Sequence, residues 1–186
     1  MIDGAAKSDN FQTNMTMNQT EQAMISVGGV FHVECLDADG NVKWTEEFHN
    51  LVVNQGLNSM NNVYFYYSAT AQITTWYMGL MGAVTTGVAA GDTLASHTGW
   101  AEFTDYSGSR PTISWASSTT ANPAVITSSA RSFTITNTGT VTGAFVCSVA
   151  SGTSGTLFSA KTFSASRNVV NGDTLNVTYS LSNTAT

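Results

Sequence analysis

The segment Thr174-Leu175-Asn176-Val177-Thr178-Tyr179-Ser180-Leu181 decides the fold class, because polar and apolar side chains alternate along its whole length. Successive side chains of a β-strand point to opposite faces of the sheet, so this alternation is typical of a strand with one face in a core. The apolar positions are Leu175, Val177, Tyr179 and Leu181. Threonine suits the other face, since its branched side chain favours strands and its hydroxyl group can stay hydrated.

Similar segments occupy most of the chain after residue 70. Strands are predicted at 73–81, 110–117, 132–137, 141–149 and 156–163, besides 174–181. In 141–149 the side chains expected to point inward are Val141, Phe145, Cys147 and Val149. The separators, such as Asn137-Thr138-Gly139, consist of residue types that form tight turns. Short strands at about 8–12-residue spacing predict an all-β fold, here a jelly-roll-like antiparallel β-sandwich.

A β-hairpin is predicted between residues 29 and 48. Two alternating runs, 29–36 and 42–48, flank the turn Asp37-Ala38-Asp39-Gly40-Asn41. Asp-Gly between such runs is a strong hairpin signal, because glycine tolerates the positive φ of a tight turn. Gly-Asp also opens Gly91-Asp92-Thr93-Leu94 and Gly172-Asp173-Thr174-Leu175, and we interpret both as turns that lead into a new element.

One short helix is predicted at about residues 54–65. Leu57, Met60, Val63 and Tyr64 follow one another at helical spacing. Asn54 is a suitable N-cap residue, whereas Gly56 in the first turn weakens the helix.

Residues 1–27 are predicted to form an extended N-terminal arm, and residues 28–186 a single β-sandwich domain. The arm is polar, rich in Asn, Gln, Thr and Met, and has no sustained helical stripe. It cannot bury enough apolar surface to fold alone, so a partner would have to order it. The residues expected to contact that partner are Phe11, Met15, Met17 and Met24.

Hydroxyl groups replace charges on much of the predicted surface. Charged residues make up 10% of the chain, against about 25% in an average protein. The 186 residues include 28 Thr and 21 Ser, of which 42 follow residue 60. Such a surface can be desolvated against a partner without stranding many charges.

The net charge of −6 argues against nucleic acid as a partner, and the uneven distribution of charge suggests an attraction between the two halves of the chain. Residues 1–110 hold 11 acidic and 3 basic residues, and residues 111–186 hold 1 and 3. No basic stripe is present, so we expect no nucleic-acid binding. No apolar run approaches the roughly 20 residues of a membrane span, and the N-terminus lacks the apolar core of a signal peptide. We therefore expect synthesis in a cytoplasm and no membrane contact.

The cysteines and histidines give no clear sign of chemistry. Cys35 and Cys147 each lie in an apolar run, which favours buried free thiols, although a disulfide remains possible. His32, His49 and His97 are scattered, without metal-ligand spacing. We expect no catalytic residue, metal or other cofactor.

Two acidic motifs also have simpler interpretations. The turn at 37–41 resembles the start of a calcium loop, but Val42 and Phe48 stand where such a loop needs Gly and Glu. Glu46 and Glu47 would point to opposite faces of one strand, which does not favour a glycosidase pair. Trp76, Trp100 and Trp115 could stack on sugars, although core packing is more common for tryptophan in strands.

Three parts of the chain resemble segments of small structural proteins of tailed bacteriophages. The first runs from Cys35 to Asn58. The second comprises Trp76-Tyr77-Met78-Gly79-Leu80, residues 91–100, Tyr106 and Arg110-Pro111. The third combines Phe133, Gly143, Phe145, Gly155-Thr156-Leu157 and residues 172–175. The chain is most similar to capsid cement or decoration proteins, and this resemblance implies a jelly-roll trimer on the outside of an icosahedral head, bound to the major capsid protein.

Three functional hypotheses follow. The first is a cement or decoration protein that binds and stabilises a phage capsid and is located in the virion. The second is a tail, baseplate or head-fibre component with receptor or carbohydrate binding, which exposed aromatic residues near 64–67 would favour. The third is a carbohydrate-active enzyme or lectin.

Overall fold

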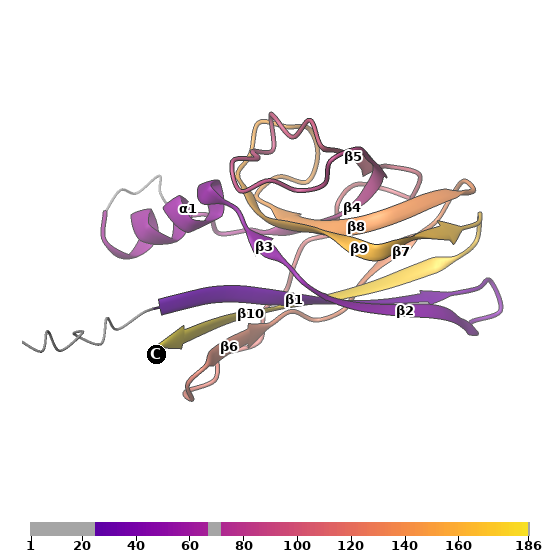
Figure 1. The fold of residues 1–186 in the computed structure, drawn as a ribbon. Helices are drawn as coiled ribbons and strands as arrows, with labels where there is room; N and C mark the ends of the chain where they lie inside the picture. The colour runs from indigo at the N-terminus through magenta and orange to yellow at the C-terminus, as the bar shows by residue number, and fades with distance from the viewer. Residues whose placement is uncertain (1–24, 67–71, 186) are drawn as a thin grey trace, which may run out of the picture.

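Two antiparallel sheets face each other in the computed structural model, which describes residues 25–66 and 72–185 (Figure 1). The first sheet contains β1 (Ile25–Leu36), β2 (Val42–His49), β6 (Ala124–Thr127), β7 (Arg131–Thr134) and β10 (Thr174–Ala185). The second contains β3 (Leu51–Val52), β4 (Tyr77–Val84), β5 (Trp100–Phe103), β8 (Gly139–Cys147) and β9 (Leu157–Val169). The helix α1 (Asn54–Tyr64) covers one end. The predicted all-β sandwich with one short helix is confirmed.

The strand orders are β2-β1-β10-β6, with β7 also paired to β10, and β3-β9-β8-β4-β5. The last strand lies beside the first along its whole length, from Ile25 opposite Ala185 to Leu36 opposite Thr174. Such a return of a late strand to an early one is typical of Greek-key and jelly-roll sandwiches. The pairing of β1 with β10 places both ends of the described chain in one sheet.

The alternation in 174–181 produces the main core. Leu175, Val177 and Tyr179 are fully buried in β10, and Leu181 is partly buried at the end of the same face. Tyr179 lies opposite Phe31 of β1, with ring centroids 4.7 Å apart.

The second sheet is covered on both faces, which the sequence did not indicate. The register of β8 against β9 shifts between Val141 and Gly143. A β-bulge of this kind reverses the alternation of the residues that follow. Val141 therefore lies in the core between the sheets, whereas Phe145 and Cys147 lie in a second cluster on the outer face. The prediction that Val141, Phe145 and Cys147 share one face was wrong, although all three are buried.

Three predicted strands differ clearly from the structure. The strand predicted at 156–163 is too short, because β9 continues to Val169. Residues 73–76 precede β4, which begins only at Tyr77. Residues 110–117 are not a strand, because this segment crosses from one sheet to the other. Ile113 N donates to Trp76 O in front of β4, and Ala116 N donates to Thr127 O in β6. The segment makes only isolated β-bridges, from Thr112 to Tyr77 and from Trp115 to Ser128, so it pairs continuously with neither sheet.

The predicted hairpin is confirmed, and both Gly-Asp segments form turns, although only the turn at 172–173 leads directly into a strand, β10. Asp37 Oδ1 accepts bonds from the backbone N–H groups of Asp39 and Asn41, and Gly40 has φ of 85°. In each Gly-Asp turn the carboxylate accepts a bond from the N–H group three residues earlier. Asp92 binds Ala89 at 3.0 Å, and Asp173 binds Val170 at 2.8 Å.

The strand β1 begins at Ile25, so it includes three residues that were assigned to the arm. Phe11, Met15, Met17 and Met24 lie outside the described residues. No helix in the described ranges is both long enough and apolar enough to cross a membrane.

Candidate interaction surface at the helical end of the sandwich

The first turn of α1 is held tightly against β9. A Cβ atom on Gly56 would lie 2.3 Å from Phe158 O, so only glycine allows this approach of helix to strand. Gln55 Oε1 accepts a 2.7 Å bond from Leu157 N. The helix begins at Asn54, one residue earlier than a cap at Asn54 would give; Val53 is the N-cap and makes no side-chain cap bond, so the assignment of Asn54 as N-cap was wrong.

The last turn of α1 and the residues after it expose a group of large apolar side chains. This group, the aromatic end, consists of Val63, Tyr64, Phe65 and Tyr66. The exposed fractions are 76% for Tyr64, 86% for Phe65 and 69% for Tyr66. Isolated apolar residues on a surface are normal, but a contiguous aromatic group typically marks a contact site. The spacing that predicted the helix gave no sign that these residues would be exposed.

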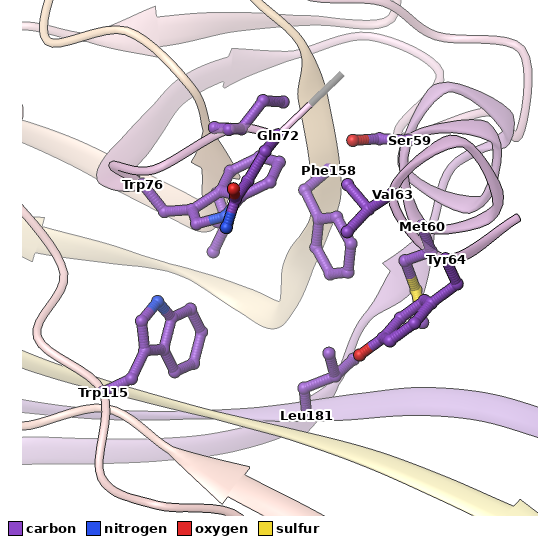
Figure 2. Close-up of a pocket in the computed structure, with 11 residues that line it drawn as sticks. Ser59, Met60, Val63, Tyr64, Gln72, Trp76, Trp115, Phe158 and Leu181 are labelled. Carbon is purple, nitrogen blue, oxygen red and sulfur yellow. The ribbon is translucent and has the colours of Figure 1, made fainter. Parts of the chain in front are cut away.

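A groove of about 210 Å³ lies between the helix and the open end of the sandwich (Figure 2). Met60, Val63 and Tyr64 line it on the side of α1, and Trp76, Trp115 and Leu181 line it on the side of the sheets. We call it the Trp groove. The rings are held by T-shaped contacts, with centroids 5.3 Å apart for Trp76 and Phe158 and 5.9 Å apart for Trp115 and Tyr179.

The chemistry of the Trp groove is apolar. None of the described residues that line it is charged, and its polar side chains are those of Ser59, Gln72 and Tyr64. For comparison, a cavity of about 150 Å³ lined by aliphatic and aromatic groups holds benzene in another protein. The groove therefore has room for at least one large apolar side chain. Trp76 and Trp115 line it and are partly buried, whereas Trp100 packs in the outer cluster.

The loop that contains His97 is held together by hydrogen bonds and ring stacking. The His97 ring stacks on Trp100 at a centroid distance of 3.8 Å, and its Nδ1 lies 3.0 Å from Trp100 O. Trp100 Nε1 donates to Asp92 Oδ2 at 3.0 Å. These contacts close the loop over Phe145 on the outer face of the second sheet.

An ion pair between Arg110 and Glu102 anchors the loop that contains Arg110 to β5, and further bonds of Arg110 reach the loop after β8. Arg110 donates to both carboxylate oxygens of Glu102, at 2.7 and 2.6 Å, and also to the carbonyl groups of Val149 and Gly152. Burial opposes the charge of Arg110, but its bonds to Glu102 and the negative charges that Cys147, Glu102 and Tyr106 can carry together outweigh burial and raise its pKa. Burial has the opposite effect on the pKa of Tyr106, which it raises because the charged form of a tyrosine is the deprotonated one. Arg110 therefore has a structural role in this chain.

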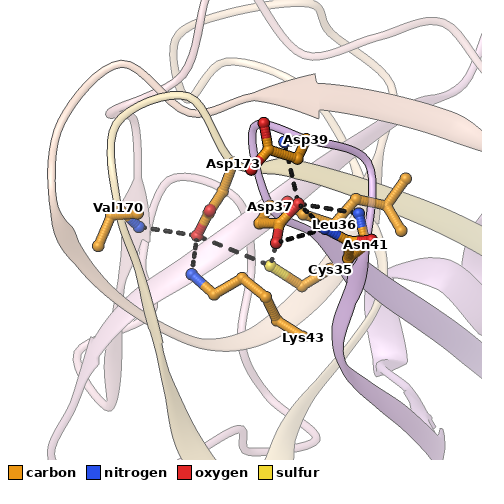
Figure 3. Close-up of polar contacts among 8 residues, drawn as sticks. All are labelled: Cys35, Leu36, Asp37, Asp39, Asn41, Lys43, Val170 and Asp173. Carbon is orange, nitrogen blue, oxygen red and sulfur yellow. Dashed lines mark hydrogen bonds and ion pairs between the residues drawn. The ribbon is translucent and has the colours of Figure 1, made fainter.

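A second buried carboxylate joins the hairpin to the last turn (Figure 3). Asp173 Oδ2 accepts bonds from Lys43 Nζ at 2.5 Å and from Val170 N, and it lies 3.8 Å from Cys35 Sγ. Burial, helped by the charge of Asp173, raises the pKa of Cys35 to about 11. Cys35 and Cys147 are both buried and free, as expected.

The two adjacent glutamates of β2 point to opposite faces, as predicted. Glu46 is buried and pairs with Arg167, whose Nε donates to Glu46 Oε1 at 2.7 Å, whereas Glu47 is exposed. In the described ranges no group of three or more His, Cys, Asp or Glu side chains is arranged to hold a metal ion. The ion pairs of the described residues thus join strands and turns of the fold, and the aromatic end with its groove is the most distinctive surface.

Comparisons with protein-family models, with curated proteins and with solved structures each found no match.

Proposed function

We propose that this chain is a non-catalytic structural protein that docks on a larger protein assembly, specifically the outside of a phage capsid. The observation that carries the proposal is the aromatic end, where Tyr64, Phe65 and Tyr66 project from a rigidly anchored helix. The resemblance to capsid cement proteins suggests the assembly, with the major capsid protein as partner and the virion as location.

The physical properties of the chain support docking. Aromatic side chains contribute much of the binding energy at protein interfaces, because they bury a large area at a low cost in conformational entropy. The low charge content means that few ion–water contacts are lost when the surface is covered. On a symmetric shell, a homo-oligomer such as a trimer would multiply a modest contact into strong attachment.

Paired substitutions at the aromatic end test the proposal. Phe65→Ser with Tyr66→Ser should leave the fold intact, since both side chains are exposed, and should weaken binding to phage heads at least about tenfold. Val42→Ser is the matched control, because Val42 is also exposed but lies in the hairpin at the far end. Equal binding by the double variant, the control and the wild type would contradict the docking role of the aromatic end.

A second candidate is a tail, baseplate or head-fibre component that binds a receptor or carbohydrate. The exposure of Tyr64 and Tyr66 favours it, because exposed aromatic rings stack on sugars. Many copies on the head support the first candidate, and a few copies at the tail support the second. Glycan hydrolysis by the isolated protein would instead favour an enzyme.

A further inference from the structure

The Trp groove lies beside the point where the first 24 residues join the described fold. Ile25 pairs with Ala185, and Gly29 pairs with Leu181, which lines the groove. At about 3.3 Å per residue, the start of β1 is therefore about 13 Å from the level of Leu181. A segment that precedes Ile25 can reach the groove only by turning back.

The sequence before Ile25 contains a stretch that matches the groove in chemistry. Residues 10–20, Asn10-Phe11-Gln12-Thr13-Asn14-Met15-Thr16-Met17-Asn18-Gln19-Thr20, have no charged side chain. In an extended chain Phe11, Met15 and Met17 would share one side, because they occupy odd positions, and every even position is polar. Methionine is flexible, and its sulfur makes favourable contacts with aromatic rings.

The length of the intervening chain also fits. Met17 precedes Ile25 by eight residues. Seven residues, 18–24, lie between them. A four-residue turn at 21–24 reverses the chain direction, and the three residues that remain span about 10 Å, so Met17 would lie about 10 Å and Met15 about 17 Å inward from the start of β1. The level of Leu181, about 13 Å from the start of β1, therefore lies between Met17 and Met15.

We propose that residues 10–20 turn back on their own chain and insert Met15 and Met17 into the Trp groove. The insertion covers Trp76 and Trp115 with apolar side chains and desolvates no charge, because neither the segment nor the described lining of the groove has one. This inference concerns the isolated chain and does not depend on capsid binding.

Alkylation of single introduced cysteines tests the insertion in the full-length protein. Met17→Cys and Asn18→Cys place a thiol at neighbouring positions that would face opposite sides of an extended segment. We expect N-ethylmaleimide to modify Met17→Cys at least about tenfold more slowly than Asn18→Cys, the factor expected from burial of one methionine-sized side chain. The wild type is the blank, because Cys35 and Cys147 are buried. Equal rates for the two variants would overturn the proposal.

Two further measurements identify the site and the source of the segment. Val63→Arg places a charge at the mouth of the groove on an exposed helix position, and it should abolish the protection of Met17→Cys. Protection that persists would overturn the assignment to this groove. Protection should also be independent of protein concentration. Loss of protection on dilution would show that a second copy supplies the segment, and it too would overturn the proposal.

Discussion

Gly56→Ala should destabilise the protein, although the same change stabilises an isolated helix by about 1 kcal/mol. The added Cβ would lie 2.3 Å from Phe158 O, whereas carbon–oxygen contacts in proteins are usually about 3.3 Å or longer. The helix must therefore move by about 1 Å. Overpacking of this kind costs about 1–3 kcal/mol.

The same movement strains two hydrogen bonds between the helical region and β9. Val53 N donates to Phe158 O at 3.1 Å, and Leu157 N donates to Gln55 Oε1 at 2.7 Å. Each is worth about 1 kcal/mol. With the gain in helix propensity subtracted, the free energy of unfolding should fall by roughly 2–4 kcal/mol.

Urea denaturation followed by tryptophan fluorescence measures this change. The matched control is Gly28→Ala in β1, where a Cβ would meet nothing within 4 Å, and its effect should stay within about 0.5 kcal/mol. If Gly56→Ala proves as stable as the wild type or more stable, the close contact between α1 and β9 does not exist, and the support for the aromatic end is lost with it.

Further predictions concern the buried charges and the thiols. Glu102→Gln should lower the free energy of unfolding by about 3 kcal/mol, because it leaves the buried Arg110 without its counter-charge. The control Glu47→Gln, at an exposed position, should change the free energy of unfolding by less than about 0.5 kcal/mol in the same urea assay. Stability should fall as the pH rises from 9 to about 11, because the unfolded chain releases the Cys35 proton near its ordinary pKa of 9.0 and the folded protein retains it until about 11. The loss is at most about 2–3 kcal/mol, and Cys35→Ala should show a shallower decline than the wild type; identical slopes would contradict the assignment.

Much of the architecture follows from local patterns in the sequence. Strict alternation over eight residues located the main core at β10, and Asp-Gly between two such runs located the first hairpin. These signals succeed because a side chain's face and a turn's φ are local properties. The helix was also found from its spacing, although its cap was not, because α1 is fixed by Gly56 against β9 rather than by a side chain at its own end.

The remaining features depend on contacts between distant segments. The bulge after Val141 moves Phe145 to the other face, and no local pattern marks a single extra residue. The exposure of Tyr64 was equally hidden, because apolar residues at helical spacing usually face a core. One clue to the ion pair was present, since an arginine in a chain with only six basic residues is a candidate for a specific partner. Its partner Glu102 could be identified only once the loops were placed.

The most direct test of the structural role is the position and copy number of this protein in purified phage particles that carry it. Imaging at low resolution, combined with quantitative mass spectrometry, gives both. The proposal predicts many copies on the outside of the head, arranged with its symmetry, and heads that become fragile when the protein is removed. A few copies confined to the tail, or heads that stay equally robust without it, would contradict the proposal.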